Sequence, residues 1–498
     1  MSDFTELVDL ASERVGGVAL AANDEFFAPK ENLLRASAPV FIEDKYTDRG
    51  KWMDGWETRR RREPGHDWAI IRLGLPGVIR GVVVDTRHFK GNYPEKCSLE
   101  ACAAEPNATA EHLQAAQWVE ILPPSNLQGD TQNRFSIESP WRFTHLRLNI
   151  FPDGGVARLR VYGDVIPDWK QVLAVGGEID LIAVENGGRV CGASDMFFGS
   201  RHNLILPGPA RNMGDGWETR RRRGPGHDWA IVQLGAEGVV RRLEVDTSHF
   251  KGNFPESCSL EGCQTSDATL ADAHWRELLP RTRLRADTRH VFEEELKEAG
   301  PVTHLRLNIF PDGGVARLRA FGEVTPAGRR QAAVRGFNAL LPQEAERALR
   351  ACCGSSRWAH QMLARRPFGS LEQMQEAADA ISRTLGREDW LEAFRAHPRI
   401  GEKASEKQEA AARAWVEQEQ SGTRGASEKL RAELREANRE YEQRFGWLFI
   451  VCATGKTTEE MLALLRQRLQ NEPDKELAVA AEEQRRITRL RVEKLLTL

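Results

Sequence analysis

The sequence lacks the features that mark several classes of protein. It has no excess of charge of one sign, with 70 Lys and Arg against 73 Asp and Glu and a net charge of −3. Proteins with a broad nucleic-acid surface carry an excess of basic residues, so this balance argues against such a partner. No apolar run approaches the roughly 18 residues of a membrane span, and the first residues lack the pattern of a secretory signal. We therefore expect a cytoplasmic protein without a membrane partner.

Cysteine is also scarce, with eight residues in a chain of 498. Two pairs share one spacing, Cys97 with Cys102 and Cys258 with Cys263. Side chains five positions apart on a strand point to opposite faces, which excludes a disulfide or a shared metal within the strand. We interpret all four as buried free thiols. His and Asp residues could serve as metal ligands, but no H-E-x-x-H or similar ligand spacing occurs, so we do not expect a metal. We expect no other cofactor either.

Long blocks of sequence occur twice in the first two thirds of the chain. Residues 54–70 return at 215–231 with a single change, and residues 144–160 return unchanged at 303–319. A chain of 498 residues is too long for one hydrophobic core, and about three domains is the usual expectation for this length. Because each repeated unit is far longer than a solenoid repeat, we interpret the units as two homologous domains.

The repeated blocks have the pattern of β-strands. Leu146, Leu148 and Ile150 alternate with polar residues, and the FPDGG sequence that follows is typical of a turn. Short alternating segments separated by Gly and Pro turns predict a β-sandwich or jelly roll. We expect two tandem all-β domains, at residues 1–170 and 171–328.

Helix signals dominate the last third of the chain. Residues 370–373 and 457–460 fit the N-terminal capping box, and residues 461–469 have apolar side chains at helical spacing. We expect a separate all-α domain at residues 335–498. Within it, the charged stretch 402–444 is interpreted as a pair of solvent-exposed helices.

The repeated motifs closely resemble those of allantoicase, a hydrolase that converts allantoate to ureidoglycolate and urea. The motifs are GWETRRRR followed by PGHDW, then DTxHFKGN, then HLRLNIFPDGG, and each is present in both repeats. The resemblance covers roughly residues 15–325. It implies that this part of the chain acts on allantoate.

Allantoate is a small carboxylate that carries two ureido groups on one carbon. Its site needs a cation for the carboxylate, polar partners for the planar ureido groups and a group that transfers protons. Arginine binds carboxylate through paired hydrogen bonds, acidic side chains accept ureido N–H bonds, and imidazole has a suitable pKa for proton transfer. The candidate substrate-binding residues are Glu57, Arg59, Arg61 and Asp67, with their counterparts Glu218, Arg220, Arg222 and Asp228. The candidate catalytic residues are His66, His88, His227 and His249.

Structural roles are the alternative for several conspicuous residues. Arginine is often used in internal ion pairs, so at least two of the four consecutive arginines at 59–62 could pair with acidic residues or cap strand edges. Trp56 and Trp68 are interpreted as core residues rather than as platforms for substrate. His145, before a strand, is interpreted as a surface or packing residue.

The last third resembles a second enzyme family, 2-oxo-4-hydroxy-4-carboxy-5-ureidoimidazoline (OHCU) decarboxylase. FNALLP, HPRIGEKA, EQSG and ANREYEQRFGWLFIVC carry this resemblance, which covers nearly all of the chain after residue 335. It implies catalytic roles for His397 and Glu419 and substrate contacts for Pro398 and Gln420.

The same resemblance implies an arginine that holds the substrate's carboxylate or ring oxygens. Arg468 in RLQN is the best match, and Arg466 is its rival. The chain departs from the family pattern at Val416, where the family has Ser, and at Leu448, where it has Pro.

Together the two resemblances imply a bifunctional enzyme of urate breakdown, which releases urea from allantoate and decarboxylates OHCU to (S)-allantoin. One alternative is a carbohydrate-binding protein with tandem β-sandwiches and a helical interaction domain, and another is a nucleic-acid binder that reads phosphate. Neither alternative explains the HPRIG and EQSG motifs. We expect small-molecule substrates, no nucleic-acid partner, and a homo-oligomer.

Overall fold

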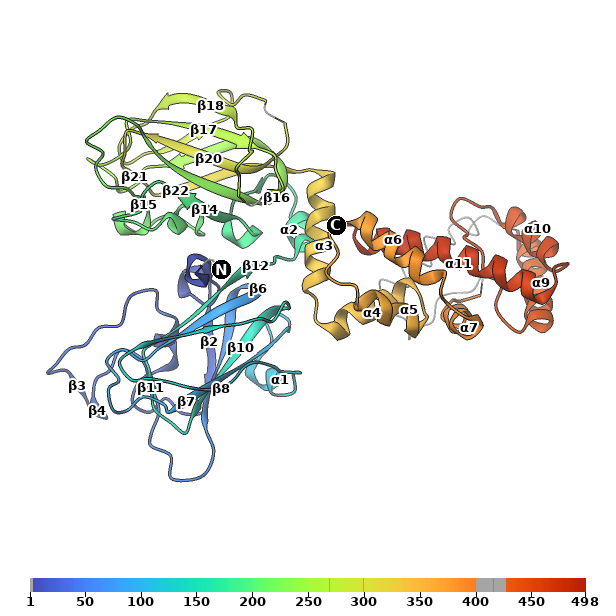
Figure 1. Ribbon diagram of the computed structural model, residues 1–498, viewed down its shortest axis with the longest axis horizontal. Helices are drawn as coiled ribbons and strands as arrows, with labels where there is room; N and C mark the ends of the chain where they lie inside the picture. Colours follow the sequence, from blue (N-terminus) through green and yellow to red (C-terminus); the bar gives the residue numbers. More distant parts are fainter. Residues whose placement is uncertain (1–2, 268, 299, 400–414, 416–426) are drawn as a thin grey trace. The chain divides into compact units, whose positions relative to one another are not determined.

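The computed structural model describes residues 3–267, 269–298, 300–399, 415 and 427–498. The chain folds as two units, Met1–Ala339 and Leu340–Leu498. The first unit contains both repeats, and in the second the described residues form helices joined by loops (Figure 1). No helix in the described part of the chain is long and apolar enough to cross a membrane.

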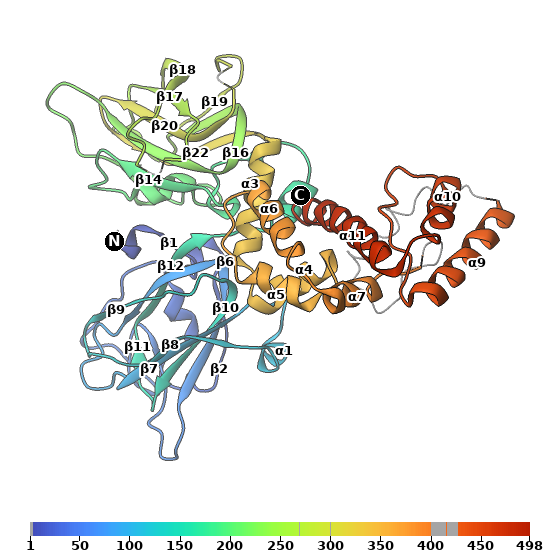
Figure 2. The same ribbon diagram turned by 45° about the vertical axis from the view of Figure 1, so that its right-hand side comes forward.

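One long strand, β6 (Asp67–Asp85), organises the first repeat. Its first half pairs with β2 (Val18–Ala22) and β10 (Arg142–Phe151), and its second half pairs with β12 (Arg158–Val165) and β9 (Gln132–Ser136). All these pairings are antiparallel. Because its two halves have different neighbouring strands, β6 takes part in both layers of a β-sandwich (Figure 2). The layers are completed by β1 (Val8–Asp9), β7 (Lys96–Cys102) and β8 (Val119–Asn126).

The apolar side chains that alternate with polar ones along the strands fill the core between these layers. Leu146, Leu148 and Ile150 on β10 are fully buried, as their spacing predicted. Trp56 is fully buried too, and its indole Nε1 donates a 2.8 Å hydrogen bond to the carbonyl oxygen of Asp24. The core role predicted for Trp56 is confirmed, and Trp68 is half-buried against a second apolar cluster.

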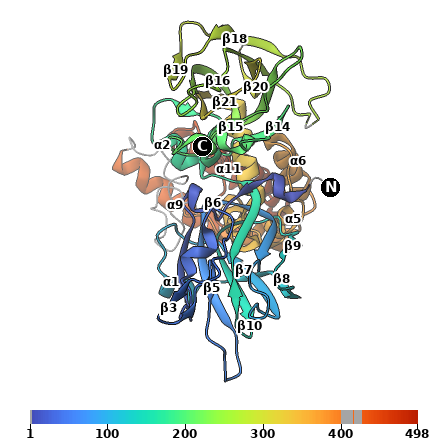
Figure 3. The ribbon, with the colours of Figure 1, turned by 90° about the vertical axis from the view of Figure 1, so that its left-hand side faces the viewer.

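Two short pairings at the edge of the sandwich position the site described below. Strand β5 (Trp56–Glu57) pairs with β11 (Gly155–Val156), and β3 (Tyr46–Thr47) pairs with β4 (Gly50–Lys51) in a hairpin. This hairpin lies at the outer left of the first repeat in Figure 1 and on the side that faces the viewer in Figure 3. The short helix α1 (Ala110–Gln114) covers the cluster around Cys102.

The second repeat has the same organisation around β16 (Asp228–Asp246). Its other strands are β13 (Ile179–Asp180), β14 (Arg189–Ala193), β15 (Trp217–Glu218), β17 (Ser257–Cys263), β18 (Arg276–Arg283), β19 (Arg289–Phe292), β20 (Val302–Phe310), β21 (Gly314–Val315) and β22 (Arg317–Val324). The two tandem all-β domains are therefore confirmed. Helix α2 (Trp169–Ala174) lies between the repeats in the sequence.

Helix α3 (Pro326–Ala339) belongs to the first unit, although in the sequence it directly precedes the helices of the second unit. The hydroxyl of Thr325 accepts a 2.9 Å hydrogen bond from the N–H of Gly328 in the first turn. A Cβ atom at Gly328 would lie 2.2 Å from the carbonyl oxygen of Glu237, so only glycine permits this approach to the second repeat. The Arg335 side chain also donates to the carbonyl oxygen of Gly235.

The second unit is all-α in its described residues, as expected. Its helices are α4 (Pro342–Cys352), α5 (Ser356–Leu363), α6 (Leu371–Ser382), α7 (Arg387–Arg395), α9 (Glu428–Phe445), α10 (Thr458–Arg468) and α11 (Pro473–Leu495). Ser370 and Thr457 cap α6 and α10, as their sequences predicted. Helix α9 accounts for the end of the charged stretch 402–444, and residues 402–414 and 416–426 of that stretch lie outside the described residues.

Candidate active sites

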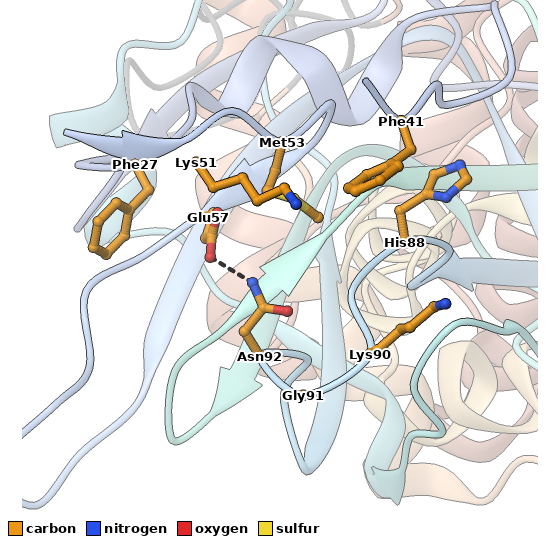
Figure 4. Close-up of a pocket in the computed structure, with 9 residues that line it drawn as sticks. All are labelled: Phe27, Phe41, Lys51, Met53, Glu57, His88, Lys90, Gly91 and Asn92. Atoms are coloured by element: carbon orange, nitrogen blue, oxygen red, sulfur yellow. Dashed lines mark hydrogen bonds between the residues drawn. The ribbon is translucent and has the colours of Figure 1, made fainter. Parts of the chain in front are cut away.

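A cavity of about 410 Å³ opens on the first repeat beside the β3–β4 hairpin. This volume suits a small-molecule ligand. The wall combines apolar, cationic and neutral or acidic polar groups (Figure 4). The apolar lining residues are Phe27, Phe41 and Met53, the cationic ones are Lys51 and Lys90, and the other polar ones are Glu57, His88 and Asn92, with Gly91 completing the wall.

Glu57 and Asn92 form a polar pair at the wall of this cavity. The amide Nδ2 of Asn92 donates a 2.7 Å hydrogen bond to Oε1 of Glu57 (Figure 4). The backbone of Glu57 is fixed by its pairing with Gly155 on β11 and by a 3.1 Å bond from its N–H to the carbonyl oxygen of Ala28. Burial raises the pKa of the Glu57 carboxyl, and the bond from Asn92 opposes this rise. Such a carboxyl is better able to hold and release a proton than an exposed glutamate.

His88 stands on the cavity wall in a strained backbone conformation. Its φ of 71° lies in the left-handed region, which is uncommon for a residue with a side chain. The ring stacks on Phe41 with centroids 5.9 Å apart, and Nε2 lies 3.2 Å from the carbonyl oxygen of Pro39. Because a carbonyl oxygen can only accept, Nε2 is the donor in this contact, and in the neutral ring Nδ1 is then an acceptor.

Lys51 and Lys90 supply positive charge to the cavity. The ammonium of Lys51 lies 4.6 Å from the centre of the Phe41 ring. Neither lysine forms an ion pair with any residue that the structure describes, and both are exposed. Both cations are therefore available to an anionic ligand.

The predicted arginines take up other positions. Nε of Arg59 lies 2.6 Å from the carboxylate of Asp24, and Nη1 of Arg61 lies 2.7 Å from the buried carboxylate of Asp67. None of the four consecutive arginines is among the described residues that line the cavity, and Arg60 and Arg62 are exposed.

The second repeat has the same arginine pairings. Arg220 pairs with Asp195, and Arg222 pairs with the buried Asp228. In both repeats the alternate arginines thus form ion pairs with acidic residues, which is the structural alternative raised from the sequence.

The two histidines of the PGHDW motifs pack on aromatic rings. The His66 ring lies 4.8 Å from that of Phe151, and the His227 ring lies 4.7 Å from that of Phe310. Nε2 of His227 is also 3.2 Å from the amide oxygen of Asn308. The structure therefore brings Glu57 and His88 together at the cavity, whereas His66 is not among the described lining residues.

Several of these features recur in the second repeat. Asn253 donates to the carboxylate of Glu218, and His249 has a φ of 72° with Nε2 3.0 Å from the carbonyl oxygen of Ala210. One contact differs, because the sulfur of Met213 lies 3.3 Å from the amide nitrogen of Asn253. The polar pair and the strained histidine are thus common to both repeats, and their surroundings are not.

His397 of the second unit lies just after α7, and its N–H donates a 3.1 Å bond to the carbonyl oxygen of Phe394. Burial and the nearby charge of Arg491 lower the pKa of its imidazole to about 3, and a hydrogen bond with Gln484 opposes this shift. The imidazole is therefore neutral at physiological pH. Gln484, Thr488 and Arg491 are buried on α11 at spacings of four and three residues, which places them on one helix face.

Arg468 lies in a different buried network. Its Nε lies 2.8 Å from the carboxylate of Glu476, and its Nη1 donates a 2.8 Å bond to the carbonyl oxygen of Ile450. The rival Arg466 pairs with Glu433 at 2.9 Å. Among the described residues, Arg491 is the cation whose charge acts on His397, and sequence reasoning missed it. The polar positions 484, 488 and 491 on one face of a predicted helix were the signal that could have found it.

Other predicted features have mixed outcomes. Pro398 is half-buried next to His397, whereas Glu419, Gln420 and Val416 lie outside the described residues.

All eight cysteines are free, and the four that recur at the same spacing in the two repeats are buried as predicted. His145 is fully buried, which makes it a packing residue. In the described part of the chain, no group of three or more His, Cys, Asp or Glu side chains is arranged to hold a metal ion.

Comparisons with known proteins divide the chain in the same way. The allantoicase repeat family matches residues 8–166 and 179–325, and the OHCU decarboxylase family matches residues 338–493. A probable allantoicase of Burkholderia mallei is 51% identical over 326 residues, which are 64% of this chain and 96% of that protein. The crystal structure of allantoicase from Saccharomyces cerevisiae is 38% identical and covers 64% of this chain and 93% of its own, with a TM-score of 0.55. A crystal structure of OHCU decarboxylase in the presence of (S)-allantoin is 37% identical and covers 30% of this chain and 99% of its own, with a TM-score of 0.26.

Proposed function

Since the chain belongs to the allantoicase family and continues into an OHCU decarboxylase domain, we propose a place and a set of residues for each reaction. The protein is a bifunctional enzyme of purine catabolism, a hydrolase and a carboxy-lyase. In the first unit it converts allantoate and water to ureidoglycolate and urea. In the second it decarboxylates OHCU to (S)-allantoin. The observation that carries the first assignment is the Glu57–Asn92 pair at a cavity of about 410 Å³ within an allantoicase repeat.

Hydrolysis of allantoate breaks the bond between the methine carbon and one ureido nitrogen, and forms a bond from that carbon to water oxygen. The leaving nitrogen gains a proton, and water loses one. Glu57 is suited to both transfers because burial raises its pKa. It protonates the leaving nitrogen while the other ureido nitrogen donates its lone pair, which leaves an iminium-like carbon. The Glu57 carboxylate then takes a proton from the water that adds to this carbon.

Neighbouring side chains complete this proposed site. Asn92 holds Glu57 through one amide hydrogen and offers its carbonyl oxygen to a ureido N–H. Nδ1 of His88 is a second acceptor for the urea group. Arg59 and Arg61 support the segment that follows Glu57 through their pairs with Asp24 and Asp67.

In the second unit, we propose that His397, Arg491 and Gln484 bind the substrate and stabilise the negative charge that develops on it as CO₂ leaves. As CO₂ leaves, the electron pair of its bond to the ring carbon passes into the ring, which then takes up a proton. His397 is neutral and can accept the proton of the substrate hydroxyl, whose oxygen becomes the carbonyl oxygen of allantoin. Arg491 is the cation for the carboxylate or the ring oxygens, and its burial strengthens such a contact. Arg468 instead stabilises the fold through Glu476. The proton-handling role assigned to Glu419 by family resemblance is kept as a proposal.

Two assays on the full-length protein test these assignments. With allantoate, urea and ureidoglycolate should form in equal amounts. With freshly generated OHCU, (S)-allantoin should form faster than by spontaneous decay, with the S enantiomer in excess. A folded protein that releases no urea would contradict the first assignment, and a racemic product at the spontaneous rate would contradict the second.

The compartment and the assembly are also proposals. Eight free thiols suit a reducing compartment such as the cytoplasm. Exposed aromatic pairs at Phe26–Phe27 and Phe197–Phe198 support self-association into a homo-oligomer. Light scattering coupled to size-exclusion chromatography would give the mass in solution, and the monomer mass at micromolar concentration would exclude the oligomer.

A further inference from the structure

We propose that the two repeats are not equivalent, and that Lys51 makes the first repeat selective for a ureido compound that carries a carboxylate. Lys51 belongs to a segment that has no counterpart of equal length in the second repeat. The inference rests on the proposed hydrolysis of allantoate, because it assigns the carboxylate of that substrate to one side chain.

The length difference is visible in the spacing of shared residues. Asp24 and Asp54 are separated by 30 positions, whereas their counterparts Asp195 and Asp215 are separated by 20. The ten additional residues of the first repeat include the β3–β4 hairpin, which ends in Lys51. The described residues 196–214 contain no such hairpin.

The ends of this segment are tied down alike in both repeats. The carboxylate of Asp54 accepts a 3.0 Å bond from the N–H of Val40, and that of Asp215 accepts a 3.0 Å bond from the N–H of Arg211. His88 contacts the carbonyl oxygen of Pro39, which precedes Val40, and His249 contacts that of Ala210, which precedes Arg211. Because the ends are fixed, the additional residues must project from the sandwich, and they form one wall of the cavity.

What the repeats share is enough to bind a ureido group. Each has a Glu–Asn pair, with one acceptor carboxylate and one amide, and each has a lysine two positions before the asparagine. Lys90 therefore has a counterpart in Lys251 and cannot distinguish the repeats.

Lys51 does distinguish them. Counting back from the shared aspartate, Asn212 stands where Lys51 does, and Met213 comes next. The sulfur of Met213 contacts the amide of Asn253, so this side of the second repeat presents a neutral group to the Glu–Asn pair. In the first repeat the Lys51 side chain extends past Glu57 toward Phe41 (Figure 4).

The chemistry of the substrate gives Lys51 its role. A carboxylate that enters a half-enclosed cavity needs a cation to offset lost hydration. The arginines nearest in sequence are engaged by Asp24 and Asp67, whereas Lys51 forms no ion pair within the described residues. The ammonium of Lys51 therefore binds the carboxylate while Glu57 and Asn92 face the ureido groups.

The test uses two matched ureido compounds, N-carbamoylglycine with a carboxylate and N-carbamoylglycinamide without one. Their affinities for the full-length protein are measured by calorimetry, together with kcat/KM for allantoate. Lys51→Gln should weaken binding of the carboxylate probe about 10- to 100-fold, which is the usual effect of losing a hydrogen bond to a charged group. It should leave the amide probe within about twofold, and Lys51→Arg should restore most of the difference.

Asn212→Gln is the matched control in the second repeat, and it should change neither probe. Equal weakening of both probes by Lys51→Gln, or no weakening of either, would overturn the role of Lys51. The two proposals fail separately: a wild-type protein that releases no urea contradicts the hydrolysis, whereas the ratio of the two affinities tests Lys51 without turnover.

Discussion

Asn92 donates a 2.7 Å hydrogen bond to Glu57 in the first repeat, and Asn253 donates to Glu218 at the same place in the second. Each pair joins the two-stranded edge of a sandwich to the HFKGN loop, across 35 positions of sequence. The Glu57 carboxyl is held by the amide of Asn92 and half-buried, so it combines a fixed position with a raised pKa. Both properties are needed by a group that gives a proton to a leaving nitrogen and takes one from water.

Replacing Glu57 by Gln tests this role while keeping the shape of the side chain. Loss of a general acid and base typically lowers the rate about 10² to 10⁴-fold, and we expect this fall in kcat for urea release. Glu63→Gln is the matched control, because Glu63 is exposed six positions away and Gly224 replaces it in the second repeat. A Glu57→Gln variant that keeps more than a tenth of the wild-type rate would exclude the proposed role.

The β-sandwiches could be predicted because alternation is a local property of the sequence. Leu146, Leu148 and Ile150 are buried by the pleat of a single strand, whatever lies opposite. The role of the arginines could not be predicted in this way. Whether Arg59 faces a ligand or pairs with Asp24, 35 positions earlier, depends on where the chain returns in three dimensions. The one sequence signal for the cavity next to Lys51 was the longer spacing between Asp24 and Asp54 than between Asp195 and Asp215.

Burial of His145 predicts acid sensitivity of the first unit. Its pKa is lowered from 6.5 to about 4 by burial and by the charge of Arg72. A group with a depressed pKa stabilises the fold above its unfolded value, near pH 6.5, and this stability is lost as the pH falls toward 4. The difference corresponds to at most about 3 kcal/mol. Urea denaturation between pH 7 and pH 4 should show a smaller loss of unfolding free energy in His145→Gln than in the wild type. If the unfolding free energies of both proteins fell equally with pH, protonation of His145 would not contribute to the acid sensitivity.

Helix α3 decides where the chain can be shortened. Residues 1–339 should fold and release urea, because α3 packs on the second repeat through Gly328 and Arg335. Residues 1–328 lack most of this helix and should unfold at a lower temperature, by at most about 2–4 °C for each kcal/mol lost, because the shift per kcal/mol falls as the folding unit grows. Scanning calorimetry of both chains gives the comparison. Equal melting temperatures would mean that α3 does not stabilise the first unit.

Arg491 offers a direct comparison with the arginine that the sequence favoured. Arg491→Gln should abolish selective formation of (S)-allantoin, whereas Arg468→Gln should destabilise the second unit by leaving the buried Glu476 without its cation. Arg489→Gln is the control on α11, since Arg489 pairs with Asp379 at the surface. The sequence could not separate 468 from 491, because both are arginines on helices. Only the fold shows that Arg468 meets the buried carboxylate of Glu476 and that Arg491 lies near His397.

The pKa of His397 predicts the pH profile of the decarboxylase. An ordinary histidine would gain a proton below about pH 6.5 and lose its function as a base. With a pKa of about 3, the imidazole of His397 stays neutral down to that pH. The rate of (S)-allantoin formation, corrected for spontaneous decay, should therefore not fall with an apparent pKa between 6 and 7. A fall in that range would mean that His397 titrates normally or that another group controls the rate.

His397→Asn tests the residue itself. If His397 takes the substrate proton, the variant should lose decarboxylation by about 10² to 10⁴-fold and keep urea release, because Glu57 lies in the other unit. The alternative is a structural role at the end of α7, where a cationic side chain would add about 0.3 to 1 kcal/mol through the helix dipole. That alternative requires a charged imidazole, which a pKa of about 3 does not provide at neutral pH. His360→Asn, exposed on α5, is the control. A His397→Asn variant with more than a tenth of the wild-type rate would exclude the catalytic role.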